Sequence, residues 1–336
     1  MRPQCLTRLA GDPACEHAGM PRFSPRRALG RTGFVATRLG IGDLADRQVP
    51  FAEGVATLRR ALEAGLNVID TAPGYEDGLS EELVGSALRG RREGVFLIDK
   101  IDHLERAVAP QVRESLARLG LPGVDLFAFH AVPTLEAWRA LAAPGGGLSQ
   151  LDEEVRAGRA RFRGISSHHP DVLRAALESG LLDVVLFPIG PWVDPRFERE
   201  VLPLARARAV GTVCFKTFGA GKLLADTEGY QRPLQARPRG KVSSGGGAPT
   251  RELPHLEVAE CLHYTLTRDP DVALLGLSFP NEQDPAFAAA EAFTEPLSED
   301  RLAAIRARAE TAIEGKGPCW WNPPLDQQLR PAGPAR

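Results

Sequence analysis

The feature that most constrains the fold of this chain is an alternation of short apolar runs with longer segments of helical period, repeated eight times. The runs are nearly continuous in Val, Leu, Ile and Phe, which is typical of strands buried on both faces. Eight strands that alternate with eight helices predict an α/β fold, the (β/α)8 TIM barrel. The predicted strands are Arg38–Gly42, Asn67–Ala72, Val95–Ile101, Val124–His130, Arg161–Ser166, Asp183–Ile189, Thr212–Thr217 and Asp271–Leu277.

The segments between these runs repeat apolar residues at three- and four-residue steps. In the first of them, Val55, Leu58, Leu62 and Leu66 form one apolar stripe, as in an amphipathic helix. Ser80 opens the second as a hydroxyl N-cap, and the two carboxylates after it favour the helix dipole. The remaining helices are predicted over Val108–Leu119, Thr134–Gly158 with an interruption at Gly145-Gly146-Gly147, Asp171–Ser179, Glu198–Ala209, Leu256–Arg268 and Asp284–Phe293.

The length of 336 residues is compatible with one domain, because α/β barrels of about 250 residues or more are routinely single domains. Glycines after Ala28 indicate a hairpin before the first strand, and an additional C-terminal helix is predicted over Ser298–Glu314. The Pro-, Gly- and Arg-rich segment Leu223–Pro254 is too long for an ordinary loop and is either a lid or disordered. We therefore predict a flexible leader (1–26), a single barrel domain (27–316) and a Pro-rich tail (317–336).

Charge and composition narrow the classes of partner. A net charge of −2 provides no bulk field for nucleic acid or for an anionic membrane, so we expect a small-molecule partner. No apolar run approaches the roughly 20 residues that span a bilayer, and residues 1–30 contain no signal-peptide core, which favours a cytoplasmic protein. The five scattered cysteines indicate neither a disulfide framework nor a zinc site. The oligomeric state is not predicted by these features.

Three of the apolar runs end on side chains that can hold or move a proton. Asp70 ends the second run, Lys100 lies at the end of the third, and His130 ends the fourth. Tyr75 follows Asp70 by five residues. Because the carboxyl ends of barrel strands meet at one rim, we expect these four side chains to form an active site there.

Motifs spread along the barrel carry a resemblance to a known family. They are Leu29-Gly30-Arg31-Thr32-Gly33, Asn67-Val68-Ile69-Asp70-Thr71-Ala72-Pro73-Gly74-Tyr75, Ser80-Glu81-Glu82-Leu83-Val84-Gly85, Lys100, Asp125-Leu126-Phe127-Ala128-Phe129-His130, the segment Gly158–Ser166 and Phe218-Gly219-Ala220-Gly221-Lys222-Leu223. With these motifs the chain resembles the aldo-keto reductases from about Leu29 to Phe293. The resemblance implies an oxidoreductase that uses NADPH or NADH to reduce aldehydes or ketones. It maps the catalytic residues of that family onto Asp70, Tyr75, Lys100 and His130.

The residue types agree with this chemistry. Carbonyl reduction builds negative charge on the carbonyl oxygen, so the site must supply a proton and a preorganised donor. A phenol with an ordinary pKa of about 10 suits the acid if a cation lowers that pKa. We expect Lys100 to be this cation for Tyr75 and Asp70 to hold it charged. Neutral His130 is expected to donate a hydrogen bond that orients the carbonyl oxygen.

The coenzyme site follows mainly from the resemblance. It implies that Ser166 and Ser167 contact the carboxamide and that the loop with Ser278, Asn281 and Glu282 holds the adenosine end. No Lys or Arg lies between Gly276 and Pro296, so NADP(H) is favoured only by family habit and NAD(H) remains possible. Bare backbone after the seventh strand suits a pyrophosphate, and lysines beside it can compensate for the missing cation. The phosphate-side candidates are Lys216, Phe218, Gly219, Gly221 and Lys222, with Arg232, Arg237 and Arg239 as further cations unless that loop is simply solvated.

Other aromatic and imidazole residues are candidates for binding a substrate or a metal. Trp192 is a candidate wall of the substrate pocket, while Trp320 and Trp321 fit packing on the barrel shell better. The adjacent His168 and His169 lack a carboxylate cluster, so no metal site is predicted. Two alternatives to a reductase stay open: a Schiff-base enzyme of aldolase type that uses Lys100, and a non-catalytic nicotinamide-binding regulator or sensor.

Overall fold

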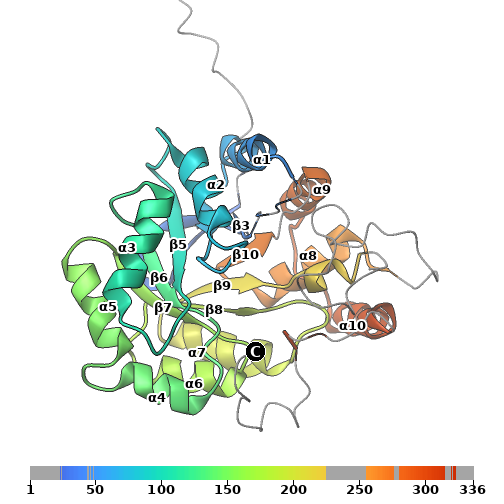
Figure 1. Ribbon diagram of the computed structural model, residues 1–336. Helices are drawn as coiled ribbons and strands as arrows, with labels where there is room; N and C mark the ends of the chain where they lie inside the picture. The colour runs from blue at the N-terminus through green and yellow to red at the C-terminus, as the bar shows by residue number, and fades with distance from the viewer. Residues whose placement is uncertain are drawn as a thin grey trace, which may run out of the picture.

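The computed structural model is a closed barrel of eight parallel strands with helices around it (Figure 1). It describes residues 23, 25–43, 45, 47, 49–224, 255–275, 280–314, 319 and 321–322. The predicted (β/α)8 barrel is confirmed, since each strand pairs with its two neighbours and the last pairs with the first. The order around the barrel is β10 (Val272–Leu275), β3 (Leu39–Ile41), β4 (Val68–Asp70), β5 (Phe96–Ile101), β6 (Leu126–Phe129), β7 (Phe162–Ser166), β8 (Val184–Pro188) and β9 (Gly211–Phe215).

The helices lie outside this barrel and cover its strands (Figure 1). Among the helices described, none combines the length and the apolar character needed to cross a bilayer. The additional C-terminal helix is present as α10. The helices are α1 (Phe51–Glu63), α2 (Leu79–Leu88), α3 (Val108–Leu119), α4 (Leu135–Ala142), α5 (Gly147–Arg156), α6 (Pro170–Glu178), α7 (Leu202–Ala207), α8 (Val258–Arg268), α9 (Pro280–Glu291) and α10 (Glu299–Ile313).

Two predicted helices are not continuous in the structure. The helix expected over Thr134–Gly158 is divided into α4 and α5 at the predicted glycine interruption, because Ala143 precedes Pro144 and is extended, and Gly145 has φ +74°. The helix expected over Glu198–Ala209 begins as a π-helical turn, η2 (Phe197–Val201), and continues as α7. The change of hydrogen bonding lies next to Pro203, which has no N–H to donate.

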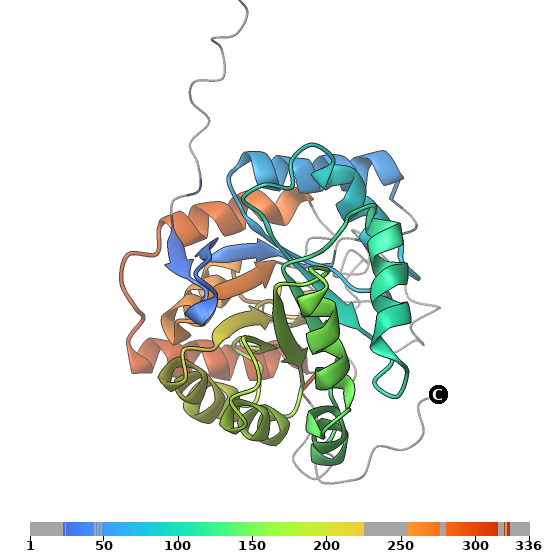
Figure 2. The same cartoon turned by 90° about the vertical axis from the view of Figure 1, so that its left-hand side faces the viewer.

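The predicted N-terminal hairpin closes one end of the barrel. β1 (Arg26–Ala28) pairs antiparallel with β2 (Val35–Thr37), and Figure 2 shows this hairpin in blue beside the barrel strands. Leu29 is fully buried in the barrel interior, in one cluster with residues at the start of the strands such as Val68 and Val184. The carboxyl ends of the strands therefore lie at the opposite end of the barrel, where side chains can form a site.

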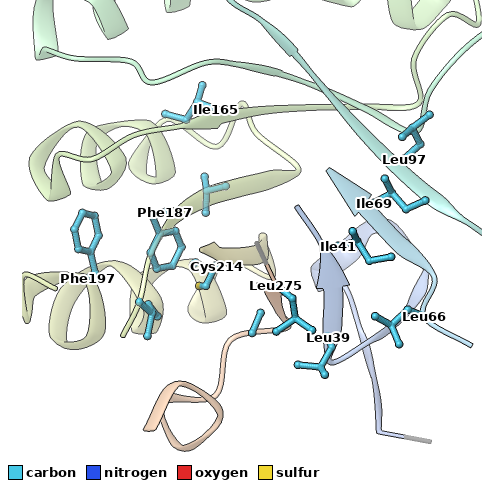
Figure 3. Packing of buried hydrophobic residues seen from close by; sticks show 14 of the residues in the cluster. Leu39, Ile41, Leu66, Ile69, Leu97, Ile165, Phe187, Phe197, Cys214 and Leu275 are labelled. Carbon is cyan, nitrogen blue, oxygen red and sulfur yellow. The ribbon is translucent and has the colours of Figure 1, made fainter. Parts of the chain in front are cut away.

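The core has an inner layer within the barrel and an outer layer between strands and helices. Along β5, Phe96 and Ile98 belong to the inner layer, whereas Leu97 and Ile101 belong to the outer one. Figure 3 shows outer-layer side chains, including Leu97 and Ile69. Since side chains alternate along a strand, the layer to which each polar residue of β5 belongs is decided by its position.

Candidate active site

The strand alternation directs three of the predicted catalytic residues toward the barrel axis. Asp70, Lys100 and His130 each lie two residues beyond an apolar residue of the inner layer. The strands are staggered, so Asp70 pairs with Ile98 and Lys100 pairs with Ala128. The three polar side chains consequently extend the inner layer at its carboxyl end. Their inner-layer predecessors are Val68, Ile98 and Ala128.

Lys100 and Asp70 form a buried ion pair. The Nζ of Lys100 donates to Oδ1 of Asp70 and, at 3.0 Å, to the backbone carbonyl of Thr71. Lys100 is 1% exposed and Asp70 is 4% exposed. A buried ammonium requires such partners, because an uncompensated charge in the interior is very costly. The pair therefore holds the ammonium of Lys100 in a fixed position at the rim.

Tyr75 lies in the turn between β4 and α2, where the next three residues all have positive φ. Its ring meets the His130 ring edge-on, with 5.6 Å between ring centroids and 82° between ring planes. Burial, followed by the charges of Asp70 and Asp43, raises the pKa of the phenol well above its ordinary value. This direction is opposite to the one expected from Lys100. The main reason is burial, which disfavours the charged phenolate, and the carboxylates around the phenol add to this effect.

His130 has a partner that the sequence analysis missed. Its Nδ1 lies 2.6 Å from Oδ1 of Asp102, and Oδ2 of Asp102 accepts the backbone N–H of Gly74 at 2.7 Å. Burial acts to raise the pKa of Asp102, but the hydrogen bond and charge of His130 outweigh it and hold that pKa below its ordinary value. The signal was present in the sequence, because Asp102 continues the inward series of Ile98 and Lys100.

Ser166 and Ser167 hold the loops around His130. The Ser166 hydroxyl accepts the backbone N–H of Ala131 at 2.7 Å. The fully buried Ser167 hydroxyl donates to the carbonyl of Val132 at 2.7 Å and accepts the N–H of His169 at 3.1 Å. These bonds occupy the single O–H donor of Ser167 within the protein, while Ser166 keeps its donor for another partner.

A second group of side chains gathers at the ends of β7 and β9. Lys216 directly follows β9 with φ +67°, and its Nζ lies 5.5 Å from the centroid of the Trp321 ring. The Nζ of fully buried Lys222 lies 5.4 Å from the same ring. His168 approaches the Trp321 carbonyl through Nδ1 at 3.2 Å. Trp321 is 1% exposed, so this tail residue packs at the carboxyl end of the barrel and not on the outer shell.

Burial disfavours the protonated forms of Lys216 and His168 in this second group. It lowers the pKa of Lys216 to about 8, although Asp43 opposes the shift. Burial, with a further contribution from Lys216, lowers the pKa of His168 to about 3. An anion bound between these groups would relieve the cost of keeping the lysine charged. Their chemistry therefore suits a phosphate.

The backbone after Lys216 is shaped for a close approach. Phe218 is buried, and Gly219–Gly221 form the short 3-10 turn η3, in which Ala220 has φ +54° and both glycines have positive φ. Successive N–H groups in such turns form concave anion sites. Trp192, the predicted pocket wall, is half-buried against the outer core.

Some predicted residues lie outside the part of the chain that the structure describes. Ser278, Trp320 and residues 225–254 are among them, and for Asn281 and Glu282 only the backbone, within α9, is described. Within the described residues, no three His, Cys, Asp or Glu side chains are grouped as metal ligands are.

Comparison with known proteins agrees with this geometry. The model of the Aldo/keto reductase family matches residues 37–306. The chain is 30% identical to pyridoxal 4-dehydrogenase of Microbacterium luteolum over 63% of this chain and 75% of the relative. It is 28% identical to the NADH-specific methylglyoxal reductase of Escherichia coli over 58% of this chain and 68% of the relative.

Solved structures show the same fold. An aldo-keto reductase from Klebsiella pneumoniae in complex with NADPH superposes with a TM-score of 0.62 at 21% identity, over 84% of this chain and 94% of that one. The family match spans most of the barrel, including the strands that carry the ion pair and His130. The chain belongs to the aldo/keto reductase family of oxidoreductases.

Proposed function

We propose that this protein reduces an aldehyde or a ketone to the alcohol with NAD(P)H, and that Tyr75 is the general acid. The observation that carries the proposal is the grouping of an ion-paired lysine, a phenol and an imidazole at the carboxyl end of one barrel. Lys100 is paired with Asp70, and the Tyr75 ring lies edge-on to His130. Such a grouping supplies both a proton and a fixed electrostatic field to a developing oxyanion.

Each side chain has a distinct task in this proposal. The coenzyme, when bound, supplies the hydride. The phenol of Tyr75 gives its proton to the carbonyl oxygen; because its pKa lies above the ordinary value, it keeps that proton throughout the neutral range. The ammonium of Lys100 stabilises the negative charge that is left on Tyr75, and His130 orients the carbonyl oxygen.

The second group of side chains fits the coenzyme. Lys216 and Lys222 place two ammonium groups beside the η3 turn, and an anion such as a pyrophosphate would be held by both and by the turn. NADP(H) is the favoured form and NAD(H) is possible. The bound NADPH of the Klebsiella pneumoniae structure supports the first, and the NADH-specific Escherichia coli relative supports the second.

The geometry does not favour a Schiff-base enzyme. Lys100 donates to Asp70 and to the Thr71 carbonyl, which is a role for an ammonium and not for the neutral amine that attacks a carbonyl.

The test is oxidation of NADPH and of NADH over a panel of aldehydes, ketones and quinones, with pyridoxal and methylglyoxal included. We expect turnover with at least one small carbonyl and a loss of about 10²–10⁴-fold in Tyr75→Phe, with coenzyme binding retained. Tight coenzyme binding without turnover across the panel would contradict the proposal and support the regulator alternative. Turnover that persists in Tyr75→Phe would remove Tyr75 as the acid.

A further inference from the structure

The carboxylate of Asp102 touches both halves of the catalytic group. Through Oδ1 it contacts Nδ1 of His130 at 2.6 Å, and through Oδ2 it accepts the N–H of Gly74 at 2.7 Å. Gly74 directly precedes Tyr75, so one side chain links the turn that carries the phenol to the strand end that carries the imidazole. A Cβ at position 74 would lie 2.6 Å from Oδ2, which shows how closely the two are packed.

This contact decides which ring nitrogen of His130 carries the proton. Asp102 is ionised at neutral pH, because its pKa lies below the ordinary value despite partial burial. An ionised carboxylate only accepts hydrogen bonds, so Nδ1 must be the donor. In the neutral ring, Nε2 then bears a lone pair and cannot donate to a carbonyl oxygen. The expectation from the sequence, that neutral His130 donates to the substrate, requires the other tautomer.

We propose that Asp102 is a positioning residue that holds His130 in its Nδ1–H tautomer, so that Nε2 donates to the substrate oxygen only from the imidazolium. The Gly74 bond holds the carboxylate while it does so. This inference rests on the proposed function for its catalytic consequence, but not for the tautomer itself. No proton is gained or lost by Asp102 in the reduction; the proton that reaches the product oxygen still comes from Tyr75.

Other charged and titratable groups surround the pair. The charge of Lys100 on β5 lowers the pKa of Asp102, and the charge of Asp102 raises the pKa of Tyr75 in the turn after β4. The charge of His130 lowers the pKa of His168, which follows β7. The charges of Asp70, Asp43 and Asp99 also raise the pKa of Tyr75. Lys100 is itself ion-paired with Asp70.

Asp102→Asn is the decisive variant, because Gly74 fixes the orientation of the new amide. The amide oxygen is needed to accept the N–H of Gly74, so the NH2 group faces Nδ1 and makes it an acceptor. The tautomer of His130 should therefore change to Nε2–H. Glu105→Gln removes the same charge from an exposed carboxylate three residues away and is the matched control.

The direct measurement is the long-range ¹H–¹⁵N spectrum of the histidine rings of the whole protein, with the His130 signal assigned through His130→Gln. We expect Nδ1–H in the wild type and in Glu105→Gln, and Nε2–H in Asp102→Asn. A neutral wild-type ring with Nε2–H, or an unchanged tautomer in Asp102→Asn, would overturn the proposal. If Asp102→Asn does not fold, the wild-type spectrum at acidic and at alkaline pH decides the question.

The kinetic arm uses the pH profile of carbonyl reduction. Asp102→Asn should lower kcat by about tenfold at acidic pH, where the charged donor is lost, with a smaller change in KM. The pH dependence of the rate should flatten in this variant but not in Glu105→Gln. A parallel drop at every pH would indicate a merely structural role and contradict the proposal. If the wild type reduces no carbonyl, the proposed function fails, while the spectra still decide the role of Asp102.

Discussion

The two sides of the barrel rim differ in their charged side chains and in the direction in which burial shifts pKa values. On the side of β4–β6, charges are held in pairs: Asp70 with Lys100, and Asp102 with His130. On the side of β7–β9, Lys216, Lys222 and His168 gather around Trp321. Burial raises the pKa of Tyr75 on the first side and lowers the pKa of Lys216 on the second.

The difference indicates what each side is built to do. Paired charges need no ligand and keep a constant geometry, as a catalytic group must. Cations whose charge is weakened by burial gain most from an arriving anion. We therefore propose that proton transfer occurs on the first side and that the coenzyme phosphates bind on the second. Each proposal can be tested separately.

The largest expected effect belongs to the paired side. Lys100→Met should lower kcat by about 10²–10⁴-fold and also destabilise the fold, because Asp70 is left as an uncompensated buried charge. The double variant Asp70→Asn/Lys100→Met should recover most of the melting temperature but none of the activity. Steady-state kinetics and thermal unfolding separate the two effects. Recovery of activity in the double variant would show that the ammonium is structural only.

The second prediction concerns the cationic side. Lys222→Met should raise the Kd for NADPH by about tenfold, since a charge-assisted contact to a phosphate is lost, and should leave the kcat at saturating coenzyme within a few-fold of the wild type. Coenzyme binding is measured by fluorescence titration at fixed salt. Lys222→Arg keeps the charge and serves as the control. An unchanged Kd in Lys222→Met would remove this lysine from the coenzyme site.

A pH dependence of binding should appear on the same side. Because the pKa of Lys216 is about 8, this lysine loses its charge as the pH rises from 7 to 9. Only the protonated form attracts an anion, so coenzyme affinity should fall by about fivefold over this window. Lys216→Met should bind more weakly at pH 7 and show a flatter profile. An equally steep profile in that variant would assign the titration to another group.

The smallest expected effect lies behind the paired side, in the outer layer. Asp99 is buried and accepts the N–H of Lys100 at 2.8 Å. Burial, together with the charge of Glu81, raises the pKa of Asp99 well above its ordinary value. The folded state thus keeps a proton that the unfolded chain releases above about pH 4, so stability falls as the pH rises through this window.

Asp99→Asn should remove this dependence, because the amide can accept from Lys100 and donate to Glu81. We expect the melting temperature at pH 7 to rise by about 2–4 °C, with the difference vanishing below pH 4. Glu105→Gln again provides the charge control. A melting temperature that falls at pH 7 would mean that Asp99 is ionised in the folded protein.

Much of the fold was predictable because it depends on local patterns. The inner and outer faces of β5 follow from alternation alone, and this alternation directs Lys100 inward and Asp99 outward. The interruption predicted at Gly145-Gly146-Gly147 lies where the structure divides α4 from α5. Local glycine signals therefore marked this break within a longer helical period.

The candidate site, like the fold, was predictable where it depends on strand position and not where it depends on packing. Asp70, Lys100 and His130 were identified as strand ends, and their shared layer follows from strand position. The inward direction of Asp102 follows from the alternation of Ile98 and Lys100, whereas its contacts with His130 and Gly74 depend on packing. The reversed pKa shift of Tyr75 could not be obtained from residue types, since it depends first on the burial of the phenol and then on the carboxylates around it.

The amino-acid sequence by itself determined the barrel, the order of its units and which strand ends carry acid, ammonium and imidazole. These follow from periods of two and 3.6 residues that any segment of chain carries locally. Tertiary structure alone decided that Asp102 joins His130 to the Tyr75 turn, and that Lys216 and Lys222 both lie beside the ring of Trp321. The reason is that electrostatics and tautomers depend on distances between residues far apart in the chain, and only packing sets those distances.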